Sequence, residues 1–110
     1  MNFGETIKEI RKRKGLSQQE LARLSGISQT YISQLEHEDD RNPSVEILSK
    51  ISQALDLPYP VLAFLTLDYD DIATNKRAAY KKIEPAVNAL IKEFFLADDK
   101  KPMKKKLVTG

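Results

Sequence analysis

The spacing of apolar residues constrains the fold of this chain more than any other feature of its sequence. Up to residue 97 of 110, apolar side chains recur every three or four positions, and no four-residue stretch alternates between apolar and polar as a half-buried strand does. Phe3, Ile7 and Ile10, for example, share one face of a helix that Gly15 ends. The pattern predicts an all-α protein.

Two short helices joined by a tight turn are predicted between residues 18 and 36. Ser17 and Glu20 have the spacing of a capping box, in which the serine hydroxyl accepts a hydrogen bond from the Glu20 amide, so a helix begins at residue 18. Gly26 ends this helix after two turns, and Ser28 is positioned to cap the next one. The two helices and their turn form one compact unit.

Further start signals divide the rest of the chain. Ser44 caps a fourth helix, and prolines at 58 and 60 frame a fifth, which completes a five-helix domain over residues 1–66. Residues 67–97 are predicted to form a C-terminal helical segment, with an acidic hinge at 68–71, one helix over about 70–83 and another that Pro85 opens. Residues 98–110 contain KKPMKKK and are predicted to be a disordered basic tail.

Composition argues against an enzyme. The chain has no cysteine, one histidine, and neither a phosphate-binding glycine loop nor a nucleophile elbow, so we expect no catalytic site, cofactor or metal site. The acidic run at 68–71 does not fit a calcium loop, because the positions that need Gly and Glu hold Ala73 and Ala79. No signal peptide or membrane-spanning run is visible, which predicts a cytoplasmic protein without membrane contact.

The segment LSQQELARLSGISQTYISQLE at 16–36 has the spacing of a DNA-binding helix-turn-helix. Small Ala22 allows close helix approach, Gly26 makes the turn, and Leu21, Ile32 and Leu35 pack the two helices together. Residues 3–66 as a whole resemble the Xre family, the lambda-repressor and Cro type, including IKEIRKRKGLSQQELA and RNPSVEILSKISQAL. The resemblance implies a five-helix lambda-repressor-like domain that binds double-stranded DNA. Repressors of this type often carry an extra dimerisation or partner-binding segment after that domain, and we expect the C-terminal helices to serve dimerisation here, although the resemblance does not extend residue by residue into them.

Short uncharged polar side chains occupy the outward face of the third helix, where an ordinary solvated face would carry lysine and glutamate. Glutamine amides can pair with adenine and a threonine methyl can meet the thymine methyl, so this face suits base edges in the major groove. The resemblance implies base contacts at Gln29, Thr30 and Gln34, and the helical spacing adds Ser33.

Five residues are candidates for DNA phosphate contacts. Gln18 and Ser28 match phosphate-binding positions of the family and lie at helix N-termini, where free amides attract anions. Tyr31 leaves two interpretations open, a ring that packs in the core and a hydroxyl that reaches a phosphate. Arg41 and Asn42 follow the third helix in a loop that runs beside the DNA backbone in relatives.

The resemblance also implies an ion pair between Arg11 on the first helix and Glu36 at the end of the third. Two solvated charges would be the alternative. If the pair is buried, its role is structural, because removal of one partner would strand the other charge.

The charge distribution departs from the family. Net charge is +3 over residues 1–35, −7 over 36–71 and +6 over 72–110, and the loop at 37–42 is acidic where relatives carry a glycine and basic residues. Residues 1–66 sum to −1, although phosphate neutralisation normally supplies much of the affinity for DNA. Dimerisation would compensate by adding a second half-site. The lysine tail either follows phosphates as an arm or only aids solubility.

The apolar face of the helix near the C-terminus must pack against another surface, because burial of each of its large apolar side chains is worth about 1.5–3 kcal/mol. This helix could pack against its own domain, against the preceding helix over about 70–83 or against the same helix of a second copy. A homodimer seam is favoured, formed by Val87, Leu90, Ile91, Phe94 and Phe95. The sequence thus predicts a sequence-specific transcriptional regulator, a repressor that binds an inverted-repeat operator as a homodimer. The alternative is an antitoxin-like protein whose C-terminal helices bind another protein and whose helix-turn-helix regulates its own gene.

Overall fold

The computed structural model describes residues 2–37 and 42–96, and within these ranges every regular element is helical. The α-helices are α1 (Phe3–Arg13), α2 (Gln18–Ser25), α3 (Gln29–His37), α4 (Val45–Ala54), α5 (Tyr59–Thr66) and α6 (Arg77–Phe95). Two 3-10 turns, η1 (Tyr69–Asp71) and η2 (Thr74–Lys76), connect α5 to α6. The all-α prediction is confirmed. Arg41, the acidic part of the loop after α3 and the tail at 98–110 lie outside the described residues.

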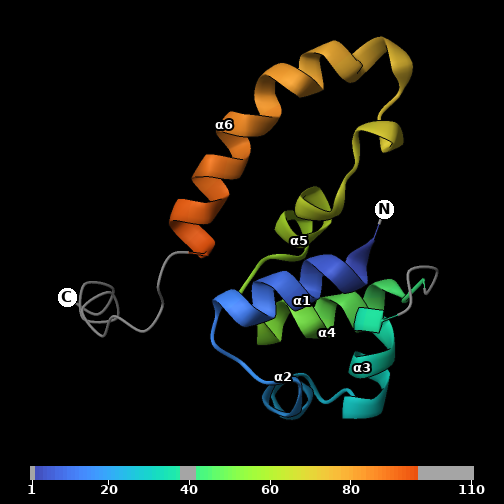
Figure 1. The fold of residues 1–110 in the computed structure, drawn as a ribbon, viewed down its shortest axis with the longest axis vertical. Coiled ribbons are helices and arrows are strands. Elements are labelled where there is room, and N and C mark those ends of the chain that lie inside the picture. Colours follow the sequence, from blue (N-terminus) through green and yellow to red (C-terminus); the bar gives the residue numbers. More distant parts are fainter. Residues whose placement is uncertain (1, 38–41, 97–110) are drawn as a thin grey trace.

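Helices α1 to α5 pack around one hydrophobic core. Ile7 of α1, Leu21 of α2, Ile32 of α3, Ile51 of α4 and Leu62 of α5 are all completely buried. Each helix contributes the apolar face that its three- and four-residue spacing predicts. Figure 1 shows α2 and α3 at one end of the molecule and α6 arching over the opposite side. None of the described helices is long and apolar enough to cross a membrane.

The helix ends follow the signals in the sequence. Ser17 and Glu20 form the predicted capping box, with the two hydrogen bonds at 3.0 and 2.8 Å. Ser28 and Ser44 accept hydrogen bonds from the backbone N–H three residues on, at 3.1 and 3.2 Å. Gly15 and Gly26 both adopt positive φ, at 74° and 75°, where other residues are strained. These local signals therefore fix where α2, α3 and α4 begin.

The capping box makes the start of α2 sensitive to acid. The hydrogen bond from the Ser17 backbone N–H, and then that from its hydroxyl, lowers the pKa of Glu20. A lowered pKa means that this contribution to stability is complete above the unfolded value of about 4.3 and is lost as pH falls through the folded value. We expect Glu20→Gln to be less stable than wild type in urea at pH 7, with the difference shrinking as the pH falls to about 3. A stability gap that is the same at both pH values would contradict this.

The prediction of two separate C-terminal helices was wrong. Arg77–Phe95 is one helix with Pro85 inside it, and residues 69–76 form the two 3-10 turns. Proline removes one hydrogen bond and pushes against the carbonyl four residues back, which bends a helix without always ending it. Pro85 and Lys81 are exposed, so water can solvate the freed Lys81 carbonyl. The bent course of α6 is visible in Figure 1.

Candidate nucleic-acid interface

The four predicted base-contacting residues form a row on the outer side of α3. Gln29, Thr30 and Gln34 are exposed and Ser33 is half-buried. Together with Gln18 from the start of α2, they line one open hollow on the surface. The structure therefore brings polar side chains of both helices of the turn to a single surface, at the end of the molecule opposite α6 (Figure 1).

The inner side of α3 fixes how this row is presented. Ile32 and Leu35 are buried in the core, and the half-buried Tyr31 packs against it. The Tyr31 backbone N–H donates to the Ser28 hydroxyl, which caps the helix. His37 is the last residue of α3, rather than part of the loop, and its Nδ1 lies 2.9 Å from the Ser33 carbonyl oxygen.

A buried network around Glu36 holds α3 in place. Arg11 donates from Nε to one oxygen of Glu36 at 2.9 Å and from Nη2 to the other at 3.0 Å, so the expected ion pair is present. The Arg11 side chain is 9% exposed and that of Glu36 is 0% exposed. Arg11 Nη1 also donates to the Leu16 carbonyl oxygen at 2.7 Å. This bidentate geometry links α1, the turn before α2 and the C-terminal end of α3.

Gln18 joins the same network, which its sequence position did not indicate. Its side-chain amide donates to Glu36 Oε1 at 3.0 Å. An amide NH₂ group has two N–H bonds, so one can hold Glu36 while the other points to a different acceptor. Gln18 therefore combines a structural contact with a place in the hollow where a phosphate contact was predicted.

Gly4 was missed by the sequence analysis, although it sets the distance between α1 and α3. A Cβ atom at this position would overlap the Leu35 carbonyl oxygen and crowd the start of Glu36. The available signal was a glycine inside a helical pattern, which usually has a packing reason because glycine weakens a helix. Gly4 lets the backbone of α1 touch the end of the helix that carries the polar row.

The remaining candidates lie elsewhere. Asn42 is exposed and follows the part of the loop that lies outside the described residues. The five residues predicted for the dimer seam separate by burial: Ile91 is buried, Val87 and Phe95 are half-buried against the core, and Leu90 and Phe94 are exposed. Within residues 2–37 and 42–96, no group of three or more His, Asp and Glu side chains gathers as a metal site would require.

The amino-acid sequence of this chain is similar to those of known transcriptional regulators. The helix-turn-helix family matches residues 7–62, about half of the chain. The HTH-type transcriptional regulator SinR of Bacillus subtilis is 43% identical over 55 residues, which is 50% of this chain and 50% of SinR. The HTH-type transcriptional repressor RghR of the same organism is 29% identical over 104 residues, 91% of this chain and 76% of RghR. The match thus spans about half the length of SinR and about three quarters of RghR.

A solved structure is similar in fold to just over half of this chain. The restriction-modification controller protein C.AhdI from Aeromonas hydrophila is similar with a TM-score of 0.52 and 39% identity, over 56% of this chain and 91% of C.AhdI.

Proposed function

Since the chain belongs to the helix-turn-helix family, we propose that it is a sequence-specific DNA-binding transcriptional regulator that acts as a repressor. It binds an inverted-repeat operator as a homodimer and represses by occupying the site. The names of SinR, a transcriptional regulator, and RghR, a transcriptional repressor, support this class of function.

One observation carries the proposal, namely the row of short uncharged polar side chains on the outer side of α3. A helix of this kind enters the major groove, and its exposed amides and hydroxyls meet the base edges. We assign base contacts to Gln29, Thr30, Ser33 and Gln34. The phosphate contacts are assigned to the residues around this row, namely Gln18, Ser28, Tyr31, Arg41 and Asn42.

Charge supports action as a dimer. Residues 1–66 have a net charge of −1, so a single copy neutralises few phosphates. Two copies related by a two-fold axis bind two half-sites about 34–36 Å apart, and their contacts add. The C-terminal segment at 67–97, which includes α6, is the part of the chain that we assign to dimerisation.

Selection of bound sequences from random duplex DNA tests the proposal. The full chain, at moderate salt, should enrich an inverted repeat whose half-sites are one helical turn apart. Enrichment of a single unrepeated site would contradict the homodimer, and the absence of any enriched sequence would contradict sequence-specific binding. In that second case a partner-binding role for the C-terminal helices would become the better explanation.

Removal of either α3 amide should weaken binding at one base position. Gln29→Ala and Gln34→Ala are each expected to cost about 1–3 kcal/mol of binding to the selected operator and to relax the base preference at a single position. Gln19→Ala, which removes an exposed amide on α2 that does not line the hollow, is the matched control and should leave the base preference at every position as in wild type. Fluorescence anisotropy with a set of single-base operator variants measures both effects. Wild-type affinity in both α3 variants would refute the base-contact assignment.

A further inference from the structure

Helix α6 presents more apolar surface than its own chain covers. Ile83, Leu90 and Phe94 are 55%, 58% and 69% exposed. At about 100° per residue they fall within a stripe roughly 40° wide along the helix. Ile91 and Phe95 are turned toward the core on a neighbouring sector, and the half-buried Val87 lies at the border between that sector and the stripe. Packing within the chain therefore buries one side of the apolar surface of α6 and leaves the stripe of Ile83, Leu90 and Phe94 open.

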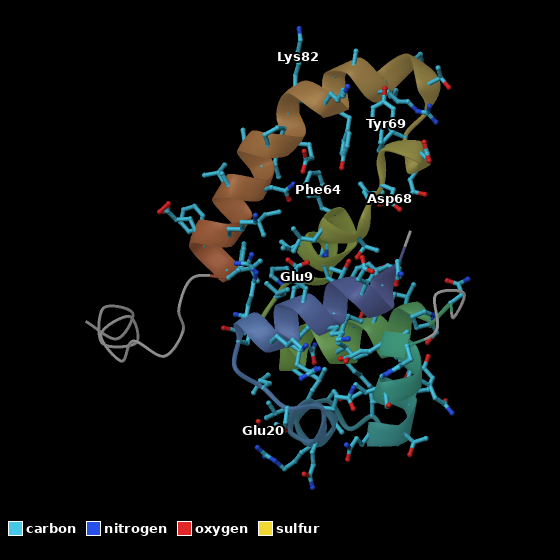
Figure 2. All side chains as sticks on the ribbon, viewed as in Figure 1. Glu9, Glu20, Phe64, Asp68, Tyr69 and Lys82 are labelled. Carbon is cyan, nitrogen blue, oxygen red and sulfur yellow. The ribbon has the colours of Figure 1, made fainter. Side chains whose placement is uncertain are left out.

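The position of α6 explains why the stripe stays open. From its start after η2 until its last turns, α6 contacts helices α1 to α5 through few side chains. One of them is Tyr80, whose ring lies 6.2 Å from that of Phe64 on α5. Figure 2 shows Phe64 between the two helices and Lys82 pointing outward from α6, away from α1 to α5. The stripe has the 4-3-4 spacing Ile83, Val87, Leu90, Phe94, which is the spacing of a helix-to-helix seam.

We infer that the stripe pairs with the α6 helix of a second copy in antiparallel orientation, an inference that rests on the homodimer proposed above. In this arrangement Ile83 lies opposite Phe94 of the second copy, and Val87 lies opposite Leu90. Such an interface is self-complementary, as two-fold symmetry requires. Of the residues predicted for the seam, Leu90 and Phe94 face the second copy, together with Ile83. Ile91 and Phe95 pack in the core of their own chain.

Charge decides the orientation. Residues 76–83 contain four basic side chains, but two of them, Arg77 and Lys81, already lie over the Tyr69 ring of the acidic turn η1 in their own chain. Lys82 is an exposed cation beside the stripe. At the other end of the stripe, Phe94 lines a groove with Leu57, Pro58 and the acidic Asp56, and Glu93 is exposed beside it, with one cation, Lys92, nearby. Lys82 and Glu93 lie on the same side of α6, because eleven residues at about 100° each leave them only about 20° apart around the helix. Antiparallel pairing therefore brings Lys82 of one copy beside Glu93 of the other, whereas parallel pairing would put like charges at the same level. Opposite charges across an interface fix its register, and like charges oppose it.

Cysteine cross-linking distinguishes the two orientations, because the natural chain has no cysteine. Lys82→Cys and Glu93→Cys change exposed residues at opposite ends of the stripe. With a short bismaleimide, a mixture of the two variants should yield cross-linked dimers, while each variant alone should yield few. In the antiparallel pair of the first variant, the two introduced thiols would lie about 20 Å apart along the helices. Cross-linking of each variant alone, without a gain on mixing, would overturn the inference.

A second variant tests the stripe itself. Leu90→Asp should raise the dimer dissociation constant at least tenfold by light scattering, and Leu24→Asp, an equivalent change at an exposed leucine on α2, should leave it unchanged. A thermal melt checks that both variants fold. A Leu90→Asp protein that remains a dimer would refute the role of the stripe.

The outcomes also separate this inference from the proposed function. If Leu90→Asp becomes a monomer but wild type enriches no DNA sequence, the stripe is a dimer seam and operator binding is refuted. If wild type enriches an inverted repeat while Leu90→Asp stays dimeric, operator binding stands and the seam lies elsewhere.

Discussion

Replacement of Arg11 by methionine is expected to lower the free energy of unfolding by about 3–5 kcal/mol. Methionine fills much of the space but leaves the Glu36 carboxylate, which is 0% exposed, with only the Gln18 amide and no positive partner. An uncompensated buried charge is costly because its hydration is lost. Urea denaturation monitored by circular dichroism measures the loss.

The exposed pair of Arg13 and Glu9 provides the matched control. These side chains are 43% and 67% exposed and lie 3.8 Å apart, so Arg13→Met should cost less than about 1 kcal/mol. Replacement of both Arg11 and Glu36 by apolar residues should recover much of the loss, since no buried charge then remains. An Arg11→Met protein as stable as Arg13→Met would show that the network around Glu36 does not hold α3 in place.

Replacement of Gly4 by alanine is expected to cost about 2–3 kcal/mol. The new Cβ would overlap the Leu35 carbonyl oxygen, and this neighbour is backbone, so α1 and α3 must move apart. Alanine favours a helix over glycine by up to about 1 kcal/mol, which offsets only part of the cost. In a domain of this size, each 1 kcal/mol lowers the melting temperature by roughly 4–8 °C.

Gly26→Ala separates this packing effect from backbone strain. Nothing lies within 4 Å of a Cβ at Gly26, but its φ of +75° is unfavourable for alanine, so we expect a cost of about 1–2 kcal/mol. Asparagine tolerates that φ better and should recover part of the loss at residue 26, whereas at residue 4 it should be worse than alanine. A stable Gly4→Ala protein would mean that α1 and α3 are not in close contact.

The helices α1 to α5 were predictable because their signals are local. Capping boxes, N-cap serines and glycines with positive φ act over three or four residues, and apolar spacing shows which face each helix buries. The resemblance to the Xre type, drawn from the same residues, is confirmed by the match to the helix-turn-helix family over residues 7–62. The outward position of Gln29, Thr30 and Gln34 also followed from helical geometry alone.

Local signals misled at Pro85 because a proline both starts and bends helices, and the sequence around it does not distinguish the two. Residues 80 and 91, on either side of this proline, turn toward the same domain, and that shared packing favours one bent helix over two. The apolar residues of α6 raised a related difficulty. Their spacing identified them, but only the packing of α6 against α1 to α5 shows which side each residue faces.

The sequence by itself determined the all-helical class, the starts of α2 to α4 and the polar row on α3, because each depends on residues within one or two turns. Only the tertiary structure revealed the close approach at Gly4, the place of Gln18 beside Glu36 and the division of α6 into covered and open sides. These features join residues that are far apart in the chain, or depend on which surfaces meet. Helix periodicity specifies a face, whereas the partner of that face is decided by how the whole chain packs.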